Sequence, residues 1–112
     1  LSRDPAVVRA YDADPLVYRG AIPARTVAEL FAHVAGFLGR APAMRTPVFV
    51  LHGTGDRLVP ANQVRPVVAA IGSPDRTLKL YEGFYHEILN EPEREQVCDD
   101  ILRWLGEHSA SA

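Results

Sequence analysis

Two short segments of the chain place a carboxylate and an imidazole where they can do chemistry together. Asp56 follows the apolar run 48–51 after a glycine-rich turn, and His86 follows the run 77–81. The two residues are 30 positions apart, which leaves room for one helix and one strand between them. A carboxylate that accepts the Nδ1–H bond of a histidine fixes its tautomer and stabilises the imidazolium formed when Nε2 takes a proton from a nucleophile. Asp56 and His86 are therefore a candidate acid–base pair.

The elements expected to position this pair are two parallel strands. Residues 48–51 form a continuous apolar run rich in β-branched side chains, which is typical of a strand buried on both faces. Residues 77–81 predict a second strand, and the helix-length connection 61–71 predicts a right-handed βαβ crossover. Pro66 in this connection indicates that its helix begins after Ala61 or bends. Functional groups collect beyond the carboxyl ends of parallel strands, which lie only ~5 Å apart, so the two loops are expected to meet.

Two helices are expected before the first strand. Residues 5–11 predict a short helix that begins at Pro5, with Asp4 as its N-cap. Residues 23–38 predict a longer one that ends at Gly39. Apolar side chains recur at helical spacing along the longer helix and predict one apolar face, formed by Val27, Leu30, Phe31, Val34 and Leu38.

The last expected helix begins near residues 90–92 and ends near residue 107, with Asn90 and Glu93 as capping partners. Cys98 lies at helical spacing from apolar residues and is expected to be a small buried side chain. The acidic residues of this segment predict an exposed helix face and a favourably charged first turn; they are Asp99, Asp100 and the carboxylates of residues 91–95.

Composition excludes several classes of function. The chain has 112 residues, with 12 Lys and Arg against 14 Asp and Glu and a net charge of −2, as expected of one ordinary globular unit. Without a block of basic residues, nucleic acid is a poor candidate partner. No apolar run approaches the ~20 residues of a membrane span. The single cysteine excludes an internal disulfide framework and a cysteine-rich zinc site.

Three runs of sequence, in this order along the chain, carry a family resemblance. Residues 14–18 (DPLVY), followed by 22–25 (IPAR), resemble the returning part of a cap region. Residues 46–60 (TPVFVLHGTGDRLVP) resemble the acid loop of α/β-hydrolases. Residues 77–87 (TLKLYEGFYHE) resemble the histidine loop of monoacylglycerol lipases, a family grouped with lysophospholipases and serine aminopeptidase-like hydrolases.

The resemblance implies the C-terminal part of an α/β-hydrolase fold: a parallel βαβ unit with flanking helices and the trailing part of a cap. It implies a serine hydrolase of carboxylic esters, acting on monoacylglycerols or lysophospholipids, with Asp56 as the catalytic acid and His86 as the catalytic base. A lipid or small ester is the implied substrate, and no cofactor or metal is implied. The implied division is residues 1–22 for the cap remainder, 23–108 for the core segment and 109–112 for a flexible tail.

The sequence departs from the family in its nucleophile. The family serine sits in a G-x-S-x-G elbow, whereas none of the serines here is flanked in this way: Ser2, Ser73, Ser109 and Ser111. The His52-Gly53 pair leads into the acid turn and is not the upstream oxyanion-hole pair of lipases. We therefore expect a piece of a longer polypeptide that is inactive by itself and can self-associate through an exposed strand edge.

Alternative interpretations remain open for several of these residues. The chain can be a non-catalytic remnant or interaction module of hydrolase ancestry. His52, Asp56 and His86 can in principle bind a metal, although they lack the usual helical spacing. His33 and His108 are expected to be structural or solvated. The aromatic and aliphatic residues near the second helix fit either a core or an acyl-chain pocket: Tyr18, Phe31, Phe37 and Leu38.

Overall fold

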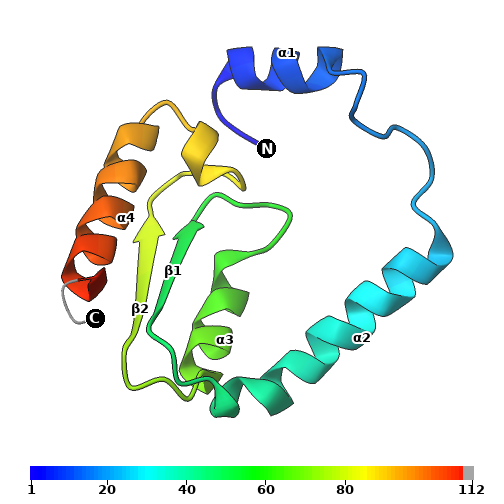
Figure 1. Cartoon of the computed structure of the whole chain (residues 1–112). Coiled ribbons are helices and arrows are strands. Elements are labelled where there is room, and N and C mark those ends of the chain that lie inside the picture. The colour runs from blue at the N-terminus through cyan, green and yellow to red at the C-terminus, as the bar shows by residue number, and fades with distance from the viewer. Residues whose placement is uncertain (110–112) are drawn as a thin grey trace.

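The structure is a computed structural model that describes residues 1–109. Short 3₁₀ turns at Ala41–Ala43, Ala61–Gln63 and Ile88–Asn90 lie between its main elements. In chain order these elements are α1 (Pro5–Ala13), α2 (Ala24–Arg40), β1 (Val48–Gly53), α3 (Val64–Ala70), β2 (Arg76–Tyr81) and α4 (Arg94–Ser109) (Figure 1). The tail expected at 109–112 lies outside the described residues except for Ser109, which ends α4.

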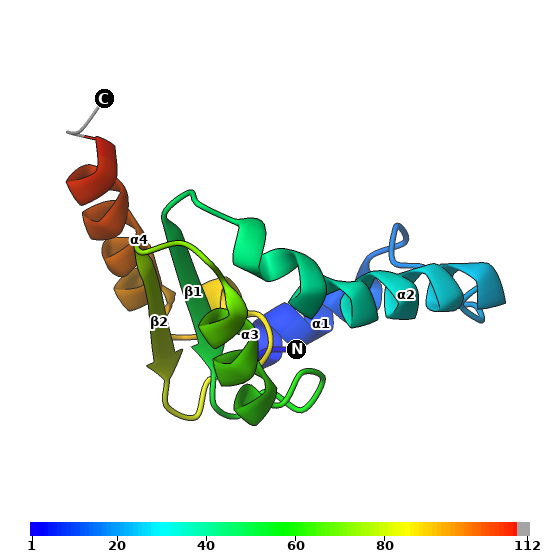
Figure 2. The same ribbon diagram turned by 90° about the horizontal axis from the view of Figure 1, so that it is seen from below.

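The predicted parallel pair of strands is confirmed. β1 and β2 pair in parallel from Val48 opposite Arg76 to Gly53 opposite Tyr81. Helix α3 makes the crossover between them, and α3 and α4 lie on opposite faces of the sheet (Figures 1 and 2). Because the strands run the same way, both carboxyl ends open at one edge of the sheet, beneath the loops that carry Asp56 and His86.

The side chains of β1 and β2 are more exposed than those of strands in a parallel sheet that is covered on both faces. Most residues of β1 are half-buried, and β2 begins with two exposed residues. Within residues 1–109 the sheet has only these two strands, so each keeps one unpaired edge. The expectation of strands buried on both faces is wrong for this chain, because α3 covers only part of one face and α4 only part of the other.

A small apolar core supports the histidine loop. Tyr81 at the end of β2, Phe84 in the loop and Val97 in α4 are all buried, and the rings of Tyr81 and Phe84 stack with centroids 5.2 Å apart. Leu51 and Ile88 pack around them. The loop that carries His86 is therefore anchored by its own aromatic side chain against α4.

Helices α1 and α2 have no buried residue, and α2 extends away from the sheet (Figure 2). The apolar face predicted for α2 is present but exposed, with Phe31 66% and Leu38 51% accessible. The expected end at Gly39 is wrong: α2 continues to Arg40, because Ala41 keeps helical dihedrals and donates its N–H to the Phe37 carbonyl. Within residues 1–109, no helix has both the length and the apolar character needed to cross a bilayer.

The proline of the crossover behaves as expected. Pro66 is the third residue of α3, where a backbone N–H has no partner inside the helix, so the ring is accommodated without a lost hydrogen bond. The helix accordingly begins after Ala61, at Val64.

The start of α4 differs from the prediction. The helix begins at Arg94, because Asn90 belongs to a 3₁₀ turn and its side chain donates to the Glu87 carboxylate. The backbone amide of Asn90 donates to the Glu87 carbonyl, so Glu93 is not its capping partner and instead forms an ion pair with Arg3. Cys98, expected to be buried, is exposed.

Two carboxylates, one expected in the charged first turn and one on an exposed helix face, are buried. Glu91 has no accessible surface, and Asp100 is 6% accessible. Asp100 accepts a hydrogen bond of 2.8 Å from the Tyr81 hydroxyl and pairs with Lys79 and Arg103. The bonds from Lys79 and Tyr81 keep the pKa of Asp100 below its ordinary value, because they outweigh the effect of burial. Charge pairing across elements therefore decides where these side chains lie.

His108 fastens the end of α4 to the start of β2. Its Nδ1 lies 2.6 Å from the Trp104 carbonyl and its Nε2 lies 2.8 Å from the Asp75 carboxylate. Both partners are acceptors, so this arrangement favours the imidazolium form of the ring. The carbonyl of Trp104 and the carboxylate of Asp75 raise the pKa of His108 above its ordinary value. His33, in contrast, is exposed and bonds to the Glu29 carbonyl in its own helix.

This contact predicts a pH-dependent contribution to stability. A histidine whose pKa is raised by folding stabilises the protein fully below its unfolded-state pKa, and this stabilisation is lost as pH rises through the folded-state value. In the protein at its full natural length, we expect His108→Gln to lower the Tm at about pH 6 and to have little effect at about pH 9. Thermal melts of both proteins across this range check the prediction, and an equal Tm difference at both ends contradicts it.

Candidate active site

The structure brings Asp56 and His86 together. β1 ends at Gly53 and leads into the turn that carries Asp56, while β2 ends at Tyr81 and leads into the loop that carries His86. The Nδ1 atom of His86 lies 2.8 Å from Oδ2 of Asp56. An ionised carboxylate only accepts hydrogen bonds, so Nδ1 carries the proton and Nε2 is the basic nitrogen of the neutral ring. This tautomer is the one that a general base requires.

The turn around Asp56 holds its carboxylate in one orientation. Oδ1 accepts hydrogen bonds from the backbone amides of Leu58 at 2.8 Å and Val59 at 3.1 Å, which leaves Oδ2 for His86. The side chain has no accessible surface. Burial alone would favour the neutral acid, but the bonds from His86 and the two amides outweigh it and lower the pKa of Asp56. Asp56 is therefore a fixed anion beside the imidazole.

His86 faces an open hollow. Its side chain is 40% exposed, in contrast to the buried carboxylate behind it. The hollow has a volume of about 270 Å³, and Asp56 and His86 share its lining with Leu1, Gly55, Arg57, Leu58 and Tyr85. The imidazole is thus accessible to a reactant while its acid partner is shielded from water, an arrangement that suits proton transfer.

Two glycines allow the acid turn to approach the histidine loop closely. A Cβ atom at Gly53 would collide with the backbone carbonyls of Phe84 and Tyr85, and one at Gly55 would lie 2.9 Å from the carbonyl oxygen of Gly83. The amide of Gly55 donates to the Phe84 carbonyl at 2.8 Å. Glycine is needed here because the two backbones are in direct contact.

His52 belongs to the site in a role that its position in the sequence did not reveal. Its Nε2 lies 2.9 Å from the Val59 carbonyl and 3.4 Å from Oδ2 of Asp56. The carbonyl can only accept, so Nε2 of His52 carries a proton and closes the turn whose amides hold Asp56. The one signal in the sequence was its place at the end of the first strand, four residues before Asp56.

The nucleophile is not found among the described serines. Each of their hydroxyls donates to a backbone carbonyl: Ser2 to Asn90, Ser73 to Asp75 and Ser109 to Gly106. Within residues 1–109, no hydroxyl or thiol forms a hydrogen bond to His86. The acid and the histidine are therefore in place without the group that they would activate.

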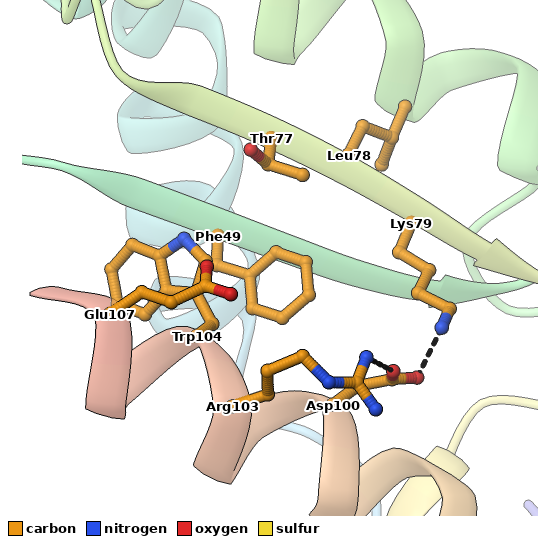
Figure 3. Close-up of a pocket in the computed structure, with 8 residues that line it drawn as sticks. All are labelled: Phe49, Thr77, Leu78, Lys79, Asp100, Arg103, Trp104 and Glu107. Carbon is orange, nitrogen blue, oxygen red and sulfur yellow. Dashed lines mark hydrogen bonds and ion pairs between the residues drawn. The ribbon is translucent and has the colours of Figure 1, made fainter.

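A second hollow of about 340 Å³ lies between α4 and the sheet and shares no residue with the first (Figure 3). Three of its charged groups pair with one another, since Asp100 binds both Lys79 and Arg103 (Figure 3). Along the described part of the chain, no three His, Cys, Asp or Glu side chains are arranged to hold a metal ion. The acid–base pair in the first hollow is therefore the better candidate site.

The aromatic and aliphatic residues near α2 are not gathered in one place. Phe37 and Leu38 line an open groove of about 490 Å³ beside Val67 of α3. Tyr18 and Phe31 are 72% and 66% exposed and do not line this groove. The groove shares no residue with the hollow at His86, so these four side chains form no acyl pocket within residues 1–109.

Comparisons with known proteins agree with this arrangement. The family described as serine aminopeptidase, S33, a hydrolase family, matches residues 1–93. A monoacylglycerol lipase of Mycolicibacterium smegmatis is 44% identical over 96% of the chain, and the human monoglyceride lipase is 32% identical over the whole chain. The crystal structure of a monoacylglycerol lipase from Paleococcus ferrophilus superposes with a TM-score of 0.88, at 31% identity over 95% of the chain.

The similarity covers only part of each relative. The chain spans 39% of the M. smegmatis protein, 38% of the human protein and 41% of the P. ferrophilus chain. The parallel sheet with its flanking helices is thus a partial α/β-hydrolase fold. With a family match over residues 1–93 and a fold shared with a solved lipase, the chain belongs to the serine aminopeptidase S33 family of α/β-hydrolases.

Proposed function

We propose that this chain supplies the acid and the base of a serine hydrolase that cleaves carboxylic esters of glycerol or of lysophospholipids. The observation that carries the proposal is the hydrogen bond between the buried Asp56 and the accessible His86 at the carboxyl edge of the sheet. The substrate class is supported by the relatives, which are named monoacylglycerol and monoglyceride lipases. Residues 1–22 are proposed to complete a cap, and residues 23–108 to complete the hydrolase core.

In the proposed reaction, a serine from outside the described residues attacks the ester carbonyl carbon. As its Oγ–C bond forms, His86 Nε2 takes the hydroxyl proton, and Asp56 stabilises the resulting imidazolium. The tetrahedral intermediate then loses the alcohol, which departs with the proton from His86. Water repeats the sequence on the acyl-enzyme, with His86 again as base and then acid.

The proposal predicts that the 112-residue chain hydrolyses no ester by itself. Its described serine hydroxyls all donate to backbone carbonyls, so His86 has no nucleophile to activate. Purified chain, assayed on a short p-nitrophenyl ester, should release product at the rate of buffer alone. Turnover that persists through further purification and disappears in His86→Ala would contradict this prediction.

The full-length protein provides the test of the proposed function. It should hydrolyse a medium-chain monoacylglycerol or a lysophospholipid, and a fluorophosphonate probe should label one serine outside residues 1–112. Comparison of the two substrates decides between the two ester classes. If the folded protein shows neither turnover nor labelling, it is a non-catalytic relative, and the Asp56–His86 pair is only structural.

A further inference from the structure

A buried carboxylate outside the acid–base pair holds the loop that carries His86. Glu91 has no accessible surface, although glutamate is rarely buried without partners. Its Oε1 accepts hydrogen bonds from the backbone amides of Tyr85 at 2.8 Å and Arg3 at 3.2 Å. Its Oε2 accepts a bond of 2.7 Å from Nε of Arg3. Both oxygens are therefore satisfied, which is what burial of a charge requires.

The first residues of the chain are joined to the backbone on both sides of His86, through Glu91 on one side and directly on the other. On one side, the amide of Tyr85 is bound to Glu91. On the other side, the amide of Glu87 donates to the Leu1 carbonyl at 3.0 Å. The guanidinium of Arg3 also lies over the ring of Phe84, 4.8 Å from its centroid. The backbone on either side of the catalytic candidate is thus fastened to the segment that precedes α1.

The bonds that Glu91 makes require a carboxylate at this position. An apolar side chain of similar size would fill the same space without the cost of burying a charge. The carboxylate accepts three bonds, from the Arg3 amide, the Arg3 side chain and the Tyr85 amide, whereas a single amide oxygen has only two lone pairs. The carboxylate therefore couples two segments that are 88 positions apart in the chain.

We propose that Glu91 is a positioning residue for His86. Together with Arg3, it fixes the backbone at Tyr85 so that the imidazole stays within hydrogen-bond reach of Asp56. The expected effect of Glu91 on catalysis rests on the proposed function. Its expected effect on the Asp56–His86 hydrogen bond does not depend on that function.

The test compares two glutamates that both contact Arg3. Glu93 pairs with the same guanidinium but forms no hydrogen bond or ion pair with the described histidine loop, so Glu93→Gln is the matched control. In the full-length protein, Glu91→Gln loses one acceptor oxygen and places an amide donor against Arg3 or the Tyr85 amide. We expect its kcat on a monoacylglycerol to fall about 10- to 100-fold with KM within about threefold, because small displacements of a catalytic group have effects of this size. Glu93→Gln should stay within about twofold.

A proton NMR measurement provides a readout that does not depend on activity. The downfield resonance of the His86 Nδ1 proton, assigned by its loss in His86→Ala, should shift or broaden in Glu91→Gln and stay unchanged in Glu93→Gln. If the wild-type protein hydrolyses no ester, the proposed function fails, and this resonance alone decides the role of Glu91.

A second variant keeps the test informative if Glu91→Gln does not fold. Glu91→Asp keeps the charge beside Arg3 but is too short to reach the Tyr85 amide as well, so it should show the same loss of kcat in a milder form. The proposal is overturned if the folded Glu91 variants keep the wild-type kcat and resonance, or if only KM changes.

Discussion

Replacement of His86 by alanine in the full-length protein is expected to lower kcat by about 10⁴- to 10⁶-fold, by analogy with the loss of a base in other serine hydrolase triads. The structure gives the reason, because His86 is the imidazole that is both accessible in the hollow and oriented by a buried carboxylate. His52 cannot replace it, since its Nε2 is engaged with the Val59 carbonyl. KM should change little, because the ring takes part in proton transfer more than in substrate binding.

The matched control is another histidine that contacts a carboxylate, but through Nε2 and with its Nδ1 also bonded to a carbonyl. His108 Nε2 lies 2.8 Å from the Asp75 carboxylate, the same separation as in the His86 pair, but this contact joins α4 to the start of β2. We expect His108→Ala to keep kcat within about threefold of wild type. Glu87→Gln, next to His86 on the loop, should also have little effect, because its side chain is directed to Asn90. Circular dichroism of each variant excludes unfolding as the cause of a loss.

If His86→Ala keeps more than about a tenth of the wild-type kcat, the assignment of the base is wrong. Equal losses in His86→Ala and His108→Ala would indicate that any disturbed Asp–His contact reduces activity through stability. The two variants together therefore separate a catalytic imidazole from a structural one.

The meeting of Asp56 and His86 could be predicted from the sequence because it depends on local rules. Two apolar runs with a helix between them make parallel strands, and parallel strands open at the same edge of a sheet. The burial of Glu91 could not be predicted in this way. Its partner Arg3 lies 88 positions away, and residues 91–95 have the composition of an exposed first helical turn.

The exposure of Cys98 and of the apolar face of α2 also depends on which elements pack against these helices. Cys98 has the spacing of a core residue, but α4 covers only a two-stranded sheet and leaves that position exposed. The apolar face of α2 is present as its spacing predicts, although no segment among residues 1–109 buries it. Patterns of spacing indicate which face of a helix is apolar, whereas burial depends on which elements are packed against that face.

The second large effect is expected for Asp56→Asn, with a loss of about 10³- to 10⁴-fold in kcat. The substitution keeps the shape of the turn, because the asparagine oxygen can still accept from the amides of Leu58 and Val59 as Oδ1 does now. The amide nitrogen then faces His86 as a donor, so Nδ1 must become an acceptor and the ring proton moves to Nε2. An imidazole with a proton on Nε2 cannot take one from a nucleophile.

The position of the proton on the His86 ring distinguishes this outcome from a structural defect. Nitrogen NMR of His86 should show the proton on Nδ1 in the wild-type protein and on Nε2 in Asp56→Asn. The Tm of Asp56→Asn should change much less than that of Asp56→Ala, because the alanine variant also loses the bonds to the turn amides. The pKa of Asp56 is lowered, so its carboxylate is ionised across the neutral range and the contrast with asparagine is complete there. If Asp56→Asn stays within about threefold of the wild-type kcat/KM, less than about 1 kcal/mol of transition-state stabilisation, Asp56 only shapes the turn and the catalytic acid is another residue.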